Sequence, residues 1–136
     1  MKKIILIEDE VVLKDLLEKK LIKCGYSVET AEDGFVGLEK IRGDRPDLIL
    51  LDIVMPRMDG FQVMEELDKE VELKGIPIIV ISNSGQPVDV NRAQDLGAVD
   101  WIVKTEFDPQ EVVDLVEKHI GKGEEGLTKG EGTVNG

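Results

Sequence analysis

Leu48-Ile49-Leu50-Leu51-Asp52 places an acid directly after four consecutive aliphatic residues. A run that is apolar at every position predicts a strand whose two faces are both covered, as in a parallel sheet. Two further runs have this form, Ile4–Ile7 and Ile76–Ile81, and Trp101–Val103 is a shorter example. Ser27–Ala31 instead alternates polar with apolar residues, which indicates a strand at the edge of the sheet.

Segments with helical spacing separate these runs. The first predicted helix ends before Gly25 and has a single apolar stripe, formed by Leu13, Leu16, Leu17 and Leu21. Four further helices are predicted from their apolar spacing, caps and closing glycines: Phe35–Ile41, Phe61–Val71, about Pro87–Leu96, and a segment from Pro109, capped by Asp108, to Ile120.

Strand and helix therefore alternate five times, which predicts an α/β fold. We expect a doubly wound, five-stranded parallel sheet in the flavodoxin-like order 2-1-3-4-5, with five helices on its two faces. In this order the strands that begin at Ile4 and Leu48 are central neighbours, and ligands bind beyond their carboxyl ends. The domain should cover residues 1–120, and residues 121–136, which include six glycines, should form a flexible tail.

The composition narrows the classes of partner. The 136 residues carry 17 Lys and Arg against 29 Asp and Glu, a formal net charge of −12, which argues against direct binding of nucleic acid. Cys24 is the single cysteine, so no internal disulfide can form. The apolar run Ile4–Ile7 is too short for a signal peptide or a membrane span. We therefore expect a cytoplasmic protein that does not enter a membrane.

Polar residues of definite kinds follow four of the predicted strands: Glu8 and Asp9, Asp52, Ser82, and Lys104. Each has an ordinary explanation by itself, because Asp and Ser often cap helices and Lys is usually solvated. Three carboxylates at one edge of a sheet, however, would repel by about 4 kcal/mol per pair at about 4 Å in an effective dielectric of about 20. Such a cluster requires a cation, and Mg²⁺ or Mn²⁺ with oxygen ligands meets that requirement.

These five residues carry a family resemblance. Together with Asp52-Ile53-Val54-Met55-Pro56-Arg57-Met58-Asp59-Gly60 and Gly97-Ala98, they resemble the receiver domains of bacterial two-component response regulators, in register over about residues 2–120. The resemblance implies a stand-alone switch without independent enzymatic turnover, activated by phosphorylation in a Mg²⁺-dependent reaction. The implied phosphodonors are a sensor histidine kinase or a histidine phosphotransfer protein.

The resemblance also implies roles for single residues. Asp52 would be the phosphoacceptor, and Asp9, Asp52 and the backbone carbonyl of Val54 would ligate Mg²⁺. Glu8, where the family more often has Asp, would reach the metal through water. Gly60 would support an unusual backbone angle in the loop before the third helix.

Further implied roles concern the response to phosphorylation. Ser82 and Lys104 match the residues that bind the phosphoryl group, and Ser82 would move toward it. Trp101 falls at the position of the switch aromatic, although a tryptophan that stays packed outward is an open alternative. A downstream target protein would bind the face formed by the fourth helix, fifth strand and fifth helix.

The sequence departs from the family pattern at three positions. Thr105 follows Lys104 where proline is usual, which leaves the reach of the lysine open. Asn83 replaces a small residue after Ser82, and Trp101 is larger than the usual aromatic.

Two rival functions remain possible on this reading. One is a phosphorylation-independent interaction module with the same fold. The other is an aspartyl-phosphate phosphohydrolase, which is disfavoured because Val54 stands where such enzymes place a second Asp. The single histidine, His119, is expected to be solvated near a helix C-terminus, and with one cysteine it offers no zinc site.

Overall fold

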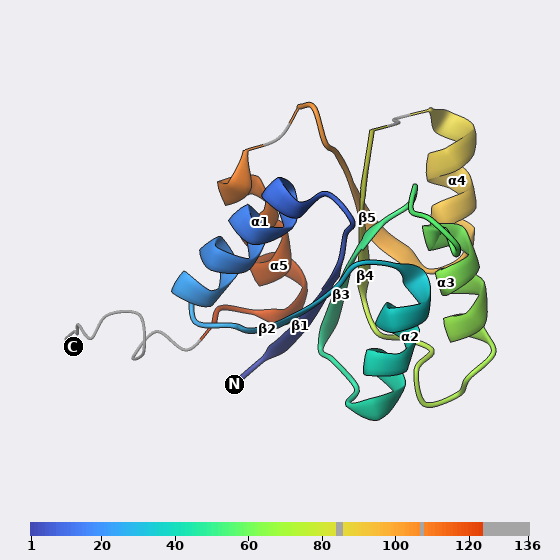
Figure 1. Ribbon diagram of the computed structural model, residues 1–136, viewed down its shortest axis with the longest axis horizontal. Helices are drawn as coiled ribbons and strands as arrows, with labels where there is room; N and C mark the ends of the chain where they lie inside the picture. Colours follow the sequence, from blue (N-terminus) through green and yellow to red (C-terminus); the bar gives the residue numbers. More distant parts are fainter. Residues whose placement is uncertain (84–85, 107, 124–136) are drawn as a thin grey trace.

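The computed structural model describes residues 1–83, 86–106 and 108–123 (Figure 1). Within these residues, five parallel strands form one sheet in the predicted order β2-β1-β3-β4-β5. The strands are β1 (Lys3–Ile7), β2 (Ser27–Ala31), β3 (Leu48–Asp52), β4 (Ile78–Ser82) and β5 (Ala98–Val103). The helices are α1 (Val11–Lys23), α2 (Gly34–Gly43), α3 (Gly60–Asp68), α4 (Pro87–Asp95) and α5 (Pro109–Ile120).

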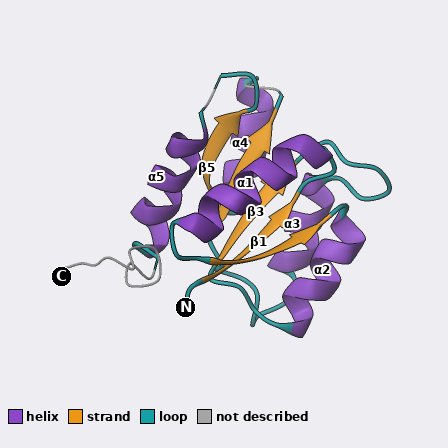
Figure 2. Ribbon diagram, turned by 60° about the vertical axis from the view of Figure 1, so that its left-hand side comes forward, coloured by secondary structure: helices purple, strands orange, loops and turns teal. Residues whose placement is uncertain are grey.

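The sheet is covered on both faces, which explains why its central strands are apolar at every position. Ile4, Leu6, Leu48 and Leu50 pack in one core with α1 and α5, while Ile5, Ile7, Ile49 and Leu51 pack in a second core with α2, α3 and α4. Figures 1 and 2 show these two helical layers on opposite sides of the strands. Successive side chains point to opposite faces, so a continuous apolar run serves both cores.

Two helices differ from their predicted form. Leu16, placed in the apolar stripe of α1, is 47% exposed, whereas Leu17 and Leu21 are fully buried. The third helix ends at Asp68 rather than at Val71, because Val71 is 88% exposed and supplies no buried contact to prolong the apolar face. The backbone N–H groups of residues 69 and 70 bond to carbonyls three residues back, which tightens the last turn.

Two strands also begin at residues other than those predicted. β4 begins at Ile78 because Pro77 has no N–H for the ladder, although its carbonyl still accepts a bond from the Ile49 N–H (3.0 Å). β5 begins three residues before Trp101, at Ala98. Its early residues are partly exposed because β5 is the second edge of the sheet, and so they lack the apolar signature of a covered strand.

The described residues contain no helix that is long and apolar enough to span a membrane. Residues 124–136, most of the predicted tail, lie outside the described residues. The predicted division at residue 120 therefore stays a prediction.

The prediction that Gly60 supports an unusual backbone angle was wrong. Gly60 is not among the residues with positive φ, whereas Arg57, in the same loop, has a φ of 68°. Glycine is required at 60 by close approach instead, because an added Cβ would lie 2.6 Å from the backbone oxygen of Asp52. The loop between β3 and α3 thus depends on contact at Gly60 and on backbone conformation at Arg57.

Gly60→Ala should therefore destabilise the fold by about 1–3 kcal/mol, because the added Cβ would clash with backbone atoms of Asp52 and Ile53, which cannot move aside cheaply. Gly43→Ala is the matched control, since a Cβ at this end of α2 meets nothing within 4 Å. It should be neutral or stabilising by up to about 1 kcal/mol. Urea denaturation measures both variants, and equal effects would contradict the close-approach explanation.

Candidate functional site

The alternation of side chains along the strands brings three predicted site residues to one side of the sheet. Ile4 and Leu6 face α1 and α5, and the pattern extends to Glu8, whose N–H bonds to the Ala31 carbonyl (2.9 Å). Asp52 follows Leu50 in the same way at the end of β3. Lys104 extends β5 on this side, with its N–H bonded to the Ser82 carbonyl (2.7 Å).

Three carboxylates and one ammonium group meet at this edge. Ligand oxygens of Glu8, Asp9 and Asp52 all lie within 4.8 Å of one another, with Glu8 and Asp52 buried and Asp9 exposed. The Nζ of Lys104 lies 3.1 Å from Glu8 Oε2 and 3.1 Å from Asp52 Oδ2. The side chain of Lys104 is only 7% exposed, so Thr105 in place of proline does not prevent it from reaching the cluster.

Glu10 is a member of the site that sequence reasoning missed. Its Oε2 lies 2.7 Å from Lys104 Nζ, the shortest of the three ion pairs that the lysine makes. Its backbone N–H also donates to Glu8 Oε2 (2.9 Å). The available signal was its place directly after Glu8-Asp9, at the residue before α1 begins.

Burial and crowding change the protonation of these groups. Burial, followed by the charge of Glu8, raises the pKa of Asp52 to about 7, although Lys104 opposes the rise. Burial also raises the pKa of Glu8. Burial lowers the pKa of Lys104, but the bonds to Glu10 and Asp52 outweigh this and raise it above its usual value. Lys104 therefore stays protonated. Its single positive charge is too small to balance the negative charges of the carboxylates around it.

A divalent cation fits this arrangement. Glu8 Oε1 is a buried oxygen with no hydrogen-bond partner, the only such side-chain atom found in the described part of the chain. A buried acceptor of this kind is costly unless something pairs with it. The donor set consists of carboxylate oxygens, which Mg²⁺ and Mn²⁺ prefer. Glu8, Asp9 and Asp52 are the residues that would hold the ion.

Ser82 and Trp101 lie on the other side of the sheet edge from Lys104. Ser82, at the end of β4, is buried, and Trp101 is half-buried against the core beneath α2, α3 and α4. Both line a hollow of about 480 Å³ that also reaches Val54, a residue that is 69% exposed. The backbone N–H of Val54 lies 3.3 Å from Asp52 Oδ1. Trp101 is thus partly covered by the core in this structure, and its role as a switch stays a prediction; Asn83 is exposed.

His119 is not simply solvated, as the sequence suggested. Its Nε2 lies 2.6 Å from Asp100 Oδ2, so it links α5 to β5. The prediction failed because the partner comes from a different element, 19 residues away in the sequence.

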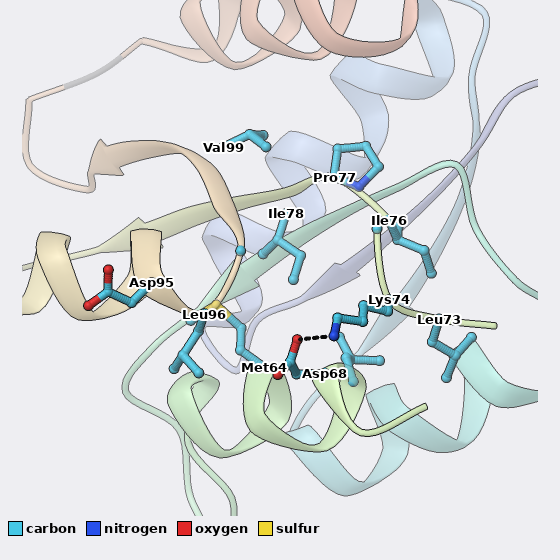
Figure 3. Close-up of a pocket in the computed structure, with 13 residues that line it drawn as sticks. Met64, Asp68, Leu73, Lys74, Ile76, Pro77, Ile78, Asp95, Leu96 and Val99 are labelled. Atoms are coloured by element: carbon cyan, nitrogen blue, oxygen red, sulfur yellow. Dashed lines mark ion pairs between the residues drawn. The ribbon is translucent and has the colours of Figure 1, made fainter. Parts of the chain in front are cut away.

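A second groove lies at the opposite end of the strands (Figure 3). It has a volume of about 320 Å³ and is lined by the ends of α3 and α4 and the start of β4. Figure 3 shows the Lys74–Asp68 ion pair at its border. Because it adjoins the amino ends of the strands, it is separate from the acidic cluster.

The family model for the response regulator receiver domain matches residues 4–117. This chain belongs to that family. A probable transcriptional regulator, ycf27, of Cyanophora paradoxa is 40% identical over 111 residues, which is 82% of this chain and 45% of that protein. The alkaline phosphatase synthesis transcriptional regulatory protein PhoP of Bacillus subtilis is 36% identical over 111 residues, again 82% of this chain and 45% of the relative. The chain thus spans less than half the length of these curated relatives.

Solved structures agree with the family. The chemotaxis protein CheY4 of Vibrio cholerae superposes with a TM-score of 0.83 at 28% identity, covering 88% of this chain and 99% of that one. The receiver domain of the sensor histidine kinase PA1611 from Pseudomonas aeruginosa, solved with a magnesium ion in its active site cleft, has a TM-score of 0.80 at 27% identity, covering 88% and 98%. The receiver fold predicted from the sequence is confirmed.

The raised pKa of Asp52 predicts a pH-dependent cost of folding in the absence of divalent cations. The unfolded carboxyl ionises near pH 4, whereas the folded one keeps its proton to about pH 7, so this group's contribution to stability is lost as the pH rises between them. When a chelator removes divalent cations at about pH 7, Asp52→Asn should therefore be more stable than the wild type by about 1 kcal/mol or more. The difference should shrink toward about pH 4.

Mg²⁺ should stabilise the wild type at neutral pH and reduce its disadvantage relative to Asp52→Asn. Asp15→Asn, on the exposed side of α1, is the charge-matched control and should show neither the pH-dependent difference nor a changed Mg²⁺ response. Denaturant titrations at several pH values measure these effects. A wild type that is as stable as Asp52→Asn at neutral pH without metal would contradict the electrostatic account.

Proposed function

We propose that this receiver domain is a phosphorylation-activated switch of a two-component phosphorelay, in which Asp52 accepts a phosphoryl group to form a phosphoaspartate. The observation that carries the proposal is the place of Asp52. Its buried carboxylate lies 3.1 Å from the Lys104 ammonium and beside an acidic cluster suited to a divalent cation. A carboxylate held this way faces positive charge where a phosphoryl group would gain its negative oxygens.

The chemistry requires little else from the protein. An oxygen of ionised Asp52 attacks phosphorus, a new O–P bond forms, and the bond from phosphorus to the imidazole nitrogen of the donor breaks. Lys104, with its pKa raised, stays protonated and donates to the phosphoryl oxygens. Bound Mg²⁺ or Mn²⁺ would neutralise these oxygens and favour the ionised form of Asp52. Glu8, Asp9, Asp52 and the carbonyl of Val54 are the proposed ligands, with Glu8 acting through water.

Ser82 and Trp101 are proposed to convert the new charge into a structural change. Phosphorylation adds about 1.5–2 negative charges at Asp52. Ser82 would turn toward them, and the hollow that it shares with Trp101 gives the indole a place to move into. The face of α4, β5 and α5 would then present a changed surface to a downstream protein. The charge of −12 supports a protein rather than nucleic acid as the direct partner of these residues.

The surface around the site supports a protein as the phosphodonor. α1 begins two residues after Asp9, and its exposed side includes Val11 (62% exposed), Val12 (82%) and Leu16 (47%). Aliphatic side chains gathered beside a charged cleft are typical of a surface that a partner covers. We propose a sensor histidine kinase or a histidine phosphotransfer protein as that partner. The cytoplasmic location stays a prediction, as does the absence of independent enzymatic turnover.

The proposal predicts covalent capture of a phosphoryl group. With Mg²⁺ and acetyl phosphate, the wild type should gain one phosphoryl group that is stable in acid and labile in base, and Asp52→Asn should gain none. Lys104→Met should slow the reaction about 10²-fold, because one preorganised cation is lost. Lys74→Met, beside the remote groove, removes the same charge and should react at the wild-type rate. Intact-protein mass spectrometry follows the adduct.

The same experiment addresses the rival functions. A folded wild type that gains no adduct from acetyl phosphate or from any histidine kinase would favour a phosphorylation-independent interaction module. Continuous release of phosphate from an added phosphoaspartyl protein would favour a phosphohydrolase.

A further inference from the structure

Arg57 has a backbone conformation that its side chain does not favour. Its φ of 68° is the only positive value at a non-glycine residue in the described ranges. Long L-residues occupy this left-handed region rarely, and such outliers persist only where the surroundings hold them. Arg57 lies in the loop of residues 53–59, between β3 and α3, which also carries Val54.

The surroundings that hold Arg57 come from the loop after β2. Its guanidinium forms an ion pair and hydrogen bond with Asp33, whose side chain is only 4% exposed. The guanidinium also lies 5.7 Å from the centre of the Phe35 ring. Asp33 is fixed in turn, because it caps α2 by accepting a bond from the Val36 N–H (2.9 Å). The bond from Arg57, then that from Val36, lowers the pKa of Asp33, so the pair remains ionised.

This ion pair crosses the end of the strand that carries two of the acids. In the sheet order, β1 lies between β2 and β3 (Figure 1), and Glu8 and Asp9 follow β1. A link from the β3–α3 loop to the β2–α2 loop therefore spans the edge of the sheet next to the acidic cluster. Close packing supports the same link, because a Cβ on Gly34 would lie 2.8 Å from the backbone oxygen of Met58.

We propose that Arg57 is a positioning residue, which fixes the Val54 segment beside the acidic cluster through its ion pair with Asp33. The inference rests on the proposed function, because it gives the β3–α3 loop a part in holding the cation. Other bonds close only parts of this loop: the Gly60 N–H bonds to the Ile53 carbonyl (2.8 Å), and the Met58 N–H to the Pro56 carbonyl (2.7 Å). The Arg57–Asp33 ion pair instead ties the loop tip to the loop after β2.

A double-mutant cycle tests this role. Asp33→Asn keeps a side-chain oxygen that can cap α2 but loses the ion pair, and Arg57→Gln loses the charge from the other side. Each should weaken Mg²⁺ binding by about 10-fold, as is typical for groups that orient metal ligands. Because both remove one interaction, the double variant should be no weaker than either single variant. Isothermal titration calorimetry of the full chain with Mg²⁺ alone gives these affinities.

Two further variants separate positioning from general stability. Arg42→Gln removes an arginine that pairs with Glu70 (2.6 Å) between α2 and the end of α3, and it should leave Mg²⁺ affinity unchanged. Arg57→Gly removes the unfavourable φ together with the ion pair, so it should fold readily yet bind Mg²⁺ as weakly as Arg57→Gln. Equal Mg²⁺ affinities in the wild type, Asp33→Asn, Arg57→Gln and Arg57→Gly would overturn the proposal, as would additive losses in the double variant.

Phosphorylation by acetyl phosphate, measured on the same samples, keeps the two claims separate. If the proposed function fails, the wild type binds Mg²⁺ but gains no phosphoryl group. If the positioning role fails, the wild type is phosphorylated and Arg57→Gln is phosphorylated at the same rate with the same Mg²⁺ affinity.

Discussion

The site depends on an excess of negative charge that one buried ammonium group cannot neutralise. Lys104 forms ion pairs with Glu8, Glu10 and Asp52, and the carboxylate of Asp9 lies within 4.8 Å of those of Glu8 and Asp52. Burial, followed by the charge of Glu8, raises the pKa of Asp52, and one oxygen of Glu8 is buried beside it without a hydrogen-bond partner. Such an arrangement lowers the stability of the fold, and the proposed function gives it a purpose, because the site would hold a cation and a phosphoryl group together.

The rest of the fold holds these negatively charged groups close together. Two apolar cores hold β1 and β3 side by side, so their terminal carboxylates cannot separate. Because successive side chains of a strand point to opposite faces of the sheet, Asp52 and Lys104 lie on one side of the sheet and Ser82 lies on the other. Charge added at Asp52 therefore adjoins two different surfaces, one near α1 and one near Trp101. This division suits a switch that receives on one side and signals on the other.

The sequence was sufficient for the architecture and for the residues that lie together in the candidate site, because both follow from continuous apolar runs and the residues that end them. It failed where a property depended on contacts between distant segments. Leu16 fits the apolar stripe of a helix but is exposed to solvent. His119 in α5 contacts Asp100 in β5, which the local sequence does not indicate. Glu10 and the Arg57–Asp33 pair were missed for the same reason, since no local pattern indicates which carboxylate a Lys or Arg side chain will reach.

The most direct test of the central claim is fluorine-19 NMR of the protein with beryllofluoride, a phosphoryl mimic, during a Mg²⁺ titration. The account predicts a bound fluoride signal that grows with Mg²⁺ and is absent from Asp52→Asn, because both the cation and the carboxylate are needed to hold the mimic. A folded wild type that shows no bound signal at saturating Mg²⁺, or one whose signal persists without any divalent cation, would contradict it.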